Sequence, residues 1–195
     1  YSASEINRKR KELEGLISNN FCGDDSREVF LTLTYRKSFK VETVKRHVKH
    51  FERVLKDRYN VEYIVVPELN SLGIVHLHYL MRFDNKLNYK AFWDFLENNW
   101  KHGYCHVSAM TAPERLGAYL LPYYSKRELV QGEWEHELIS NPDKLKQAEQ
   151  LLKNGTIDRK QAKTIAKKQR LKLLPKTLKV LRKSRGIEKP LTVTT

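Results

Sequence analysis

Two strand-like segments lie very close together in this sequence, and their spacing limits the folds open to the chain. VEYIVVPEL (61–69) and IVHLHYLMRF (74–83) are rich in β-branched and aromatic residues, and only NSLG separates them. A connection this short joins antiparallel strands, whereas parallel strands need a crossover of a dozen or more residues. The pattern therefore predicts a hairpin in which Gly73 takes the left-handed conformation of a tight loop.

Helix-like and strand-like segments flank this hairpin on both sides. Residues 40–59 and 88–100 carry apolar side chains at helical spacing, and EVFLTLTYR (28–36) and GYCHVSAM (103–110) have the composition of strands. The order strand, helix, strand, strand, helix, strand is that of the split βαβ arrangement. We therefore predict an α+β fold of the ferredoxin-like or RRM-like kind, with a central antiparallel sheet, helices on one face and a site on the open face.

Further helices are predicted outside this core. They span residues 4–18, 112–130 with a kink at Pro122, 142–153, and 156 to about 173. Residues 177–187 fit either a returning strand or another helix. The chain divides into an N-terminal helical arm (1–22), a core (23–128) and a basic helical region (129–195).

Positive charge is concentrated towards the C-terminal end. The net charge is +14, and residues 141–195 hold 16 Lys and Arg against 4 Asp and Glu. This distribution predicts a polyanionic partner, nucleic acid before membrane. No stretch approaches the roughly 18 to 20 apolar residues of a membrane span, and the first residues lack the apolar segment of a signal peptide. We therefore expect a cytoplasmic protein without a membrane partner.

Two histidines share one side of the second hairpin strand. His76 and His78 are two residues apart, so their imidazoles point the same way at about 6.5 to 7 Å separation. If the hairpin pairs residue 70 with residue 74, Glu68 faces His76. Two imidazoles and one carboxylate leave coordination positions open, and the oxygen ligand favours Mn²⁺ or Mg²⁺. The alternative is a pair of polar residues on an ordinary strand, with a solvated glutamate opposite.

A cluster of tyrosines follows in AYLLPYYSK (118–126). On a continuous helix Tyr119 and Tyr123 would lie about 40° apart around the axis, with Lys126 one turn further on, while Tyr124 would pack inward. A phenol can attack a phosphodiester when a metal stabilises charge on the phosphate. Lysine offers a positive charge for the phosphate or the developing phenolate. Tyrosines at this spacing also fit ordinary helix packing, which is the alternative interpretation.

Together these motifs resemble the three motifs of HUH endonucleases. They are FLTLTY on the first strand, HLH with Leu77 as the bulky apolar residue and Glu68 eight positions before His76, and a later tyrosine followed at +3 by lysine. The order, histidines before tyrosine, is similar to that of rolling-circle replication initiators (Rep proteins). The resemblance spans about residues 28–127, and KSRGI (183–187) is similar to a segment that often follows in plasmid and phage initiators.

The resemblance implies an enzyme that nicks one DNA strand at an origin and later rejoins it. Such an enzyme stays attached to the 5′ phosphate through tyrosine and releases a 3′-OH primer. The resemblance implies His76, His78 and Glu68 as ligands of the divalent metal.

The resemblance leaves the choice of nucleophile open. Tyr123 is preferred, because Lys126 stands three residues after it as in the YxxK motif. Tyr119 matches the additional tyrosine of the two-tyrosine initiators, YxxKYxxK. Pro122 replaces the first lysine of that pattern, which puts an alternating cycle with two nucleophiles in doubt.

Contacts with single-stranded or origin DNA are expected from the first strand and from the basic region. The candidates are Thr32, Thr34, Arg36, Lys168, Arg170 and Lys172. Ordinary strand packing is the alternative for the two threonines. Strand opening would need a host or separate helicase, because the sequence has no GxxxxGK[ST] loop.

Other functions fit parts of the same pattern. One is a single-tyrosine HUH transposase. Another is a non-catalytic ferredoxin-like protein that stacks single strands on exposed aromatic residues, although this sequence has histidines on the central strand. A repressor with a helix-turn-helix over residues 142–173 is a third. The lysine after the tyrosine and the basic C-terminal region favour the initiator.

Overall fold

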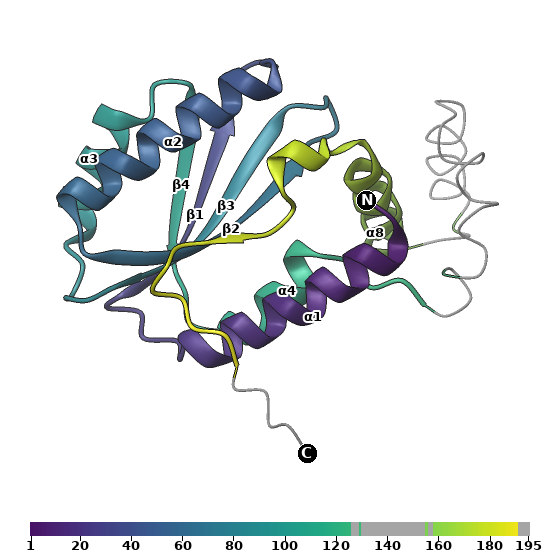
Figure 1. The fold of residues 1–195 in the computed structure, drawn as a ribbon, viewed down its shortest axis with the longest axis horizontal. Coiled ribbons are helices and arrows are strands. Elements are labelled where there is room, and N and C mark those ends of the chain that lie inside the picture. Colours follow the sequence, from purple (N-terminus) through teal and green to yellow (C-terminus); the bar gives the residue numbers. More distant parts are fainter. Residues whose placement is uncertain (126–128, 130–154, 156–157, 191–195) are drawn as a thin grey trace.

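A five-stranded antiparallel sheet forms the centre of the computed structural model, which describes residues 1–125, 129, 155 and 158–190 (Figure 1). Its strands are β1 (Glu28–Tyr35), β2 (Val61–Leu69), β3 (Val75–Phe83), β4 (Gly103–Ala109) and β5 (Arg182–Lys183). They lie in the order β4-β1-β3-β2-β5, and all neighbouring pairs are antiparallel. The first four strands have the order of the split βαβ fold, so the α+β, ferredoxin-like prediction is confirmed.

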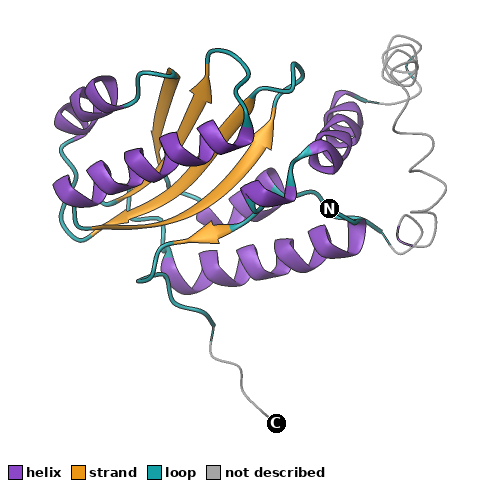
Figure 2. Ribbon diagram, turned by 45° about the horizontal axis from the view of Figure 1, so that its top comes forward, coloured by secondary structure: helices purple, strands orange, loops and turns teal. Residues whose placement is uncertain are grey.

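The two helices between the strands lie on one face of this sheet, as predicted, and further helices cover part of the other face, which was expected to be open (Figures 1 and 2). One side carries α2 (Val41–Arg58) and α3 (Tyr89–Asn99), and the other carries α1 (Ala3–Asn20), α4 (Leu116–Leu120) and α8 (Arg159–Leu173). Two short 3₁₀ helices, η1 (Pro113–Arg115) and η2 (Lys176–Leu178), complete the described helices. The second face needs a cover because it carries the apolar side chains of Ile64, Val66 and Leu80. All three side chains are fully buried.

The hairpin between β2 and β3 has the predicted register. Glu68 pairs with His76, and the Asn70 amide donates to the Ile74 carbonyl at 2.9 Å. Gly73 has a φ of 72°, the left-handed conformation that favours glycine. The position of the carboxylate opposite the histidines therefore follows from the loop.

The predicted helix over 112–130 was wrong in length. The helix α4 ends at Leu120, and Leu121 is extended, with φ −123° and ψ 122°. The residue before a proline is pushed out of the helical region by the proline ring, so Pro122 ends this helix rather than kinking it. Tyr119 therefore lies on α4, whereas Tyr123 lies beyond its end.

The basic region joins the same apolar core as the rest of the chain. Its helix α8 starts at Arg159, later than the predicted residue 156, because Asp158 and Gln161 form a capping box there. The predicted helix over 142–153 lies outside the described residues. Within 177–187 the chain forms η2 and the strand β5, and β5 pairs with the edge of β2.

None of the helices in the described part of the chain combines the length and apolar character needed to cross a membrane.

Strands β1 and β4 approach each other closely at Gly103. A Cβ atom at this position would lie 1.8 Å from the Thr34 carbonyl oxygen, and the Arg36 amide donates to the His102 carbonyl at 2.9 Å. A side chain at residue 103 would therefore force the two strands apart.

We expect Gly103→Ala to lower the free energy of unfolding by about 1 to 3 kcal/mol, because the added methyl overlaps backbone atoms. Urea denaturation measures this change. Ser108→Ala, at an exposed position of the same strand, is the control and should change stability by less than about 0.5 kcal/mol. Equal urea midpoints for the two variants would contradict the close approach.

Candidate active site

Two threonines of β1 hold the two histidines of β3. Thr32 lies opposite His78 and Thr34 lies opposite His76 in the antiparallel register. The hydroxyl of Thr32 is 3.0 Å from His78 Nδ1, and that of Thr34 is 3.4 Å from His76 Nδ1. Hydrogen bonds at Nδ1 orient an imidazole and leave its Nε2 available for another partner.

The two Nε2 atoms have different surroundings. His78 Nε2 lies 3.0 Å from Glu68 Oε2, and the His78 ring stacks on Phe30. His76 Nε2 is buried and has no hydrogen-bond partner among the described residues. Burial, reinforced by neighbouring His78, lowers the pKa of His76. His76 is therefore held as a neutral imidazole, the form that binds metal ions.

Two positively charged side chains of α8 also lie beside the Glu68 carboxylate. Lys167 Nζ lies 3.6 Å from Glu68 Oε2, and Arg170 Nη2 lies 3.5 Å from Oε1. Burial alone would raise the pKa of Glu68, but the His78 hydrogen bond and the two cations lower it to about 2. Burial lowers the pKa of Lys167 in turn. The carboxylate is thus ionised and paired on both oxygens.

The side chains of His76, His78 and Glu68 are of the types that bind a divalent metal ion, although they do not form a complete coordination site in this structure. Among the residues that the structure describes, no three His, Cys, Asp or Glu side chains lie together closely enough to count as a metal cluster. The unpartnered His76 Nε2 nevertheless faces the same side of the sheet as His78 and Glu68. A bound ion would compete with Lys167 and Arg170 for the carboxylate, so Mn²⁺ or Mg²⁺ stays a prediction.

The two candidate nucleophiles, Tyr119 and Tyr123, have different surroundings in the structure. The Tyr119 ring makes an edge contact with the His78 ring, with centroids 6.4 Å apart, and it is 59% exposed. Tyr123 is 55% exposed, and the guanidinium of Arg10 on α1 lies 5.8 Å from the centroid of its ring. Tyr124 is buried, in line with the predicted packing role. Lys126 lies outside the described residues.

A cation that sequence reasoning missed lies beside Tyr119. Lys167 donates a hydrogen bond to the Tyr119 carbonyl, and its Nζ lies 4.9 Å from the centroid of the Tyr119 ring. Lys167 precedes Arg170 by three positions and the buried Leu171 by four, so all three share one side of α8. The spacing of these three residues can be read from the sequence. The sequence does not show which side of α8 docks on the sheet.

The predicted DNA-binding residues fall into different surroundings. Arg36 is exposed at the end of β1, with its guanidinium 5.4 Å from the Tyr104 ring centroid. Lys168 lies over the Tyr124 ring and Arg170 contacts Glu68, while Lys172 is half-buried on α8. The two threonines contact the histidines. DNA binding by these residues stays a prediction.

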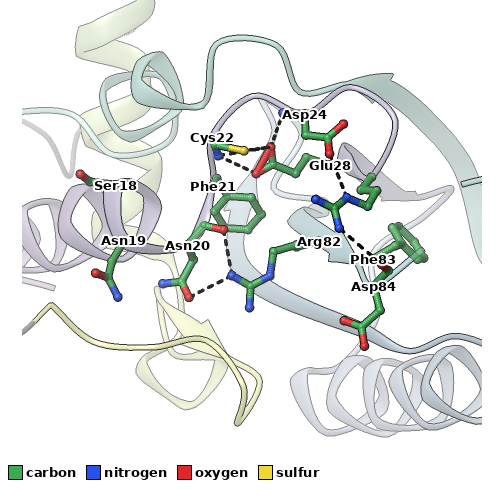
Figure 3. Close-up of a pocket in the computed structure, with 11 residues that line it drawn as sticks. Ser18, Asn19, Asn20, Phe21, Cys22, Asp24, Glu28, Arg82, Phe83 and Asp84 are labelled. Carbon is green, nitrogen blue, oxygen red and sulfur yellow. Dashed lines mark hydrogen bonds and ion pairs between the residues drawn. The ribbon is translucent and has the colours of Figure 1, made fainter. Parts of the chain in front are cut away.

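A polar pocket lies at the far end of β1 and β3, away from the histidines (Figure 3). Glu28 accepts hydrogen bonds from the amides of Cys22 and Asp24, at 2.7 and 2.6 Å. Arg82 donates to the Asn20 carbonyl at 2.9 Å. These charged groups are satisfied by backbone atoms of the pocket wall, so they serve to anchor the end of α1 to the sheet.

In metal-free buffer, we expect Glu68→Gln to lower the free energy of unfolding by about 2 kcal/mol, because it leaves Lys167 and Arg170 without their counter-charge. Adding Lys167→Met should recover part of this loss, as urea denaturation would show. Glu42→Gln, in an exposed surface pair, is the control and should have little effect. A double variant as unstable as the single one would refute the coupling.

A protein-family model covers the region that holds this site. Residues 28–128, just over half of the chain, match a family model described as replication-associated protein ORF2. The matched region contains both histidines, Glu68 and Tyr119. The comparison with curated proteins gives no match. The chain belongs to this family of replication-associated proteins, which supports the predicted role as a replication initiator acting on DNA.

Proposed function

We propose that this protein is a metal-dependent, strand-specific DNA endonuclease of the HUH type that nicks and rejoins DNA and initiates rolling-circle replication of a plasmid or virus. The observation that carries the proposal is the contact of the Tyr119 ring with His78, on the sheet face that holds His76 and Glu68. Family membership supports the replication role. Opening of the duplex is assigned to a separate helicase.

The metal-binding role falls to three side chains. His76 and His78 would bind a Mn²⁺ or Mg²⁺ ion through Nε2, and Glu68 through its carboxylate. A bound ion supplies positive charge for the oxygens of the phosphate under attack. The hydroxyls of Thr32 and Thr34 keep the two imidazoles in the orientation that this role requires.

Tyr119 is the nucleophile that the geometry favours. Its phenol loses a proton and the phenolic oxygen bonds to the phosphorus, while the bond from phosphorus to the 3′ oxygen breaks. The 3′ oxygen takes up a proton and leaves as a 3′-OH, and the 5′ phosphate remains on the tyrosine. Rejoining is the reverse transfer. Lys167, 4.9 Å from the ring centroid, places a positive charge near the phenolate.

Tyr123 is the alternative candidate for the nucleophile. The YxxK spacing favours it, because Lys126 follows at +3. The end of α4 at Leu120 takes Tyr123 off the helix that carries Tyr119. Direct mapping of the DNA attachment decides between the two.

We expect the wild-type protein to form a covalent adduct with a labelled, randomised single-stranded oligonucleotide library in the presence of Mn²⁺. Tyr119→Phe should abolish the adduct, because phenylalanine has no nucleophilic oxygen, and Tyr123→Phe should retain it. Denaturing gels detect the adduct and mass spectrometry locates the modified tyrosine. Tyr89→Phe, an exposed tyrosine on α3, is the control.

Two results would change this assignment. Loss of the adduct only in Tyr123→Phe would transfer the nucleophilic role to Tyr123. An adduct that survives in the double variant would refute tyrosine-mediated cleavage altogether.

Cleavage should stop in EDTA and resume with added Mn²⁺, because the proposed site needs a divalent ion. Paramagnetic resonance of Mn²⁺ provides a readout that does not depend on activity, and His76→Ala and His78→Ala should each weaken binding at least about tenfold. His50→Ala, an exposed histidine on α2 on the other side of the sheet, is the matched control. Undiminished cleavage in EDTA would contradict the assigned ligands.

A further inference from the structure

The sheet face that carries the histidines is covered at one edge and open at the other. On β2 and β3 the side chains of Val66, Leu80 and His78 are buried, because α1, α4 and α8 lie over this half (Figure 2). On β1 all but the first side chain of the same face are half-buried. On β4 every second side chain, starting with Tyr104, is exposed. The open half of the face is therefore a strip along β1 and β4.

An exposed aromatic ring dominates this strip. Tyr104 is 61% exposed and lies opposite Thr34, which contacts His76. The Tyr104 ring therefore lies on the same face of the sheet as the candidate active site. Arg36 lies over the ring, with its guanidinium 5.4 Å from the ring centroid. Tyrosine combines an apolar ring with a polar hydroxyl group, and for that reason it is enriched at interfaces.

The backbone beneath this ring makes close contacts with β1. Gly103 lets β4 approach the Thr34 carbonyl, and the Arg36 amide donates a hydrogen bond to the His102 carbonyl at 2.9 Å. These contacts place the backbones of Tyr104 and Arg36 next to each other.

We propose that Tyr104 and Arg36 form a base-stacking subsite for single-stranded DNA. This inference rests on the proposed function, because it extends the DNA path from the active site across β1 to β4. The ring stacks on one base, and Arg36 contributes its charge to the adjacent backbone phosphate.

The position of the ring suits a substrate that also reaches the histidines. Strands β4 and β3 are separated by β1, so the backbones at Tyr104 and His76 are about 10 Å apart at roughly 4.8 Å per strand. With about 3.4 Å for each stacked nucleotide, the base on Tyr104 lies within about three nucleotides of the phosphate at the active site. The subsite would help to select the sequence or register of the nicked strand.

The experiment measures binding of fluorescein-labelled dT20 by anisotropy in EDTA, where the proposed cleavage is off. We expect Tyr104→Ala to raise the Kd about 5- to 150-fold, since stacking contributes about 1 to 3 kcal/mol per base. Tyr104→Trp should bind within about twofold of the wild type, because it keeps an aromatic surface. Trp93→Ala, a 42% exposed aromatic residue on α3, is the matched control and should bind like the wild type.

Salt dependence separates the two members of the subsite. Tyr104→Ala should leave the slope of log K against log salt unchanged, because tyrosine carries no charge. Arg36→Ala should reduce the slope by about 1 if its guanidinium contacts a phosphate. Unfolding midpoints of the variants show whether each one folds.

The binding and adduct measurements together test the subsite separately from the nicking function. A folded Tyr104→Ala that binds dT20 like Trp93→Ala would overturn the subsite, and so would a change in oligomeric state without a change in DNA affinity. If Tyr104→Ala weakens dT20 binding but the wild type forms no adduct with the randomised library in Mn²⁺, the nicking function is overturned while the subsite stays supported.

Discussion

Strand β1 pairs with β3 so that Thr32 stands opposite His78 and Thr34 opposite His76. A shift of one residue would turn both histidines to the other face of the sheet, towards α2 and α3. The same register sets the hydroxyls against Nδ1 and leaves Nε2 for Glu68 or a metal ion. The candidate site and the open strip on β4 both depend on this pairing, because β1 is the strand between them.

The helix α8 gives the site its electrostatic character. Without a metal ion, Glu68 is neutralised by Lys167 and Arg170, and a buried carboxylate with two cations is far less costly than an unpaired one. If Glu68 held a divalent ion as proposed, Lys167 and Arg170 would be left to contact the DNA phosphates. In this proposal the basic C-terminal region is part of the active site as well as a source of general attraction for DNA.

Local signals predicted most of the elements, and the errors have identifiable causes. The hairpin register followed from Gly73 and the short loop, so the position of Glu68 opposite His76 was predictable. The helix through Pro122 was wrong because the extended conformation imposed before proline ended α4 at Leu120. Tyr119 and Tyr123 therefore do not lie about 40° apart on one helix. The preference for Tyr123 rested on the YxxK spacing with Lys126 and stays a prediction.

The sequence by itself determined the order of strands and helices, the shared face of the two histidines, and the glutamate across the hairpin, because these depend on periodicity and on contacts between near neighbours. Only the tertiary structure decided that α4 brings Tyr119 to His78, that Lys167 reaches Glu68 across ninety-nine positions of the chain, and that Tyr104 is left open. The physical reason is that such contacts depend on which helix face docks on the sheet, and several faces of a lysine-rich helix look alike in sequence.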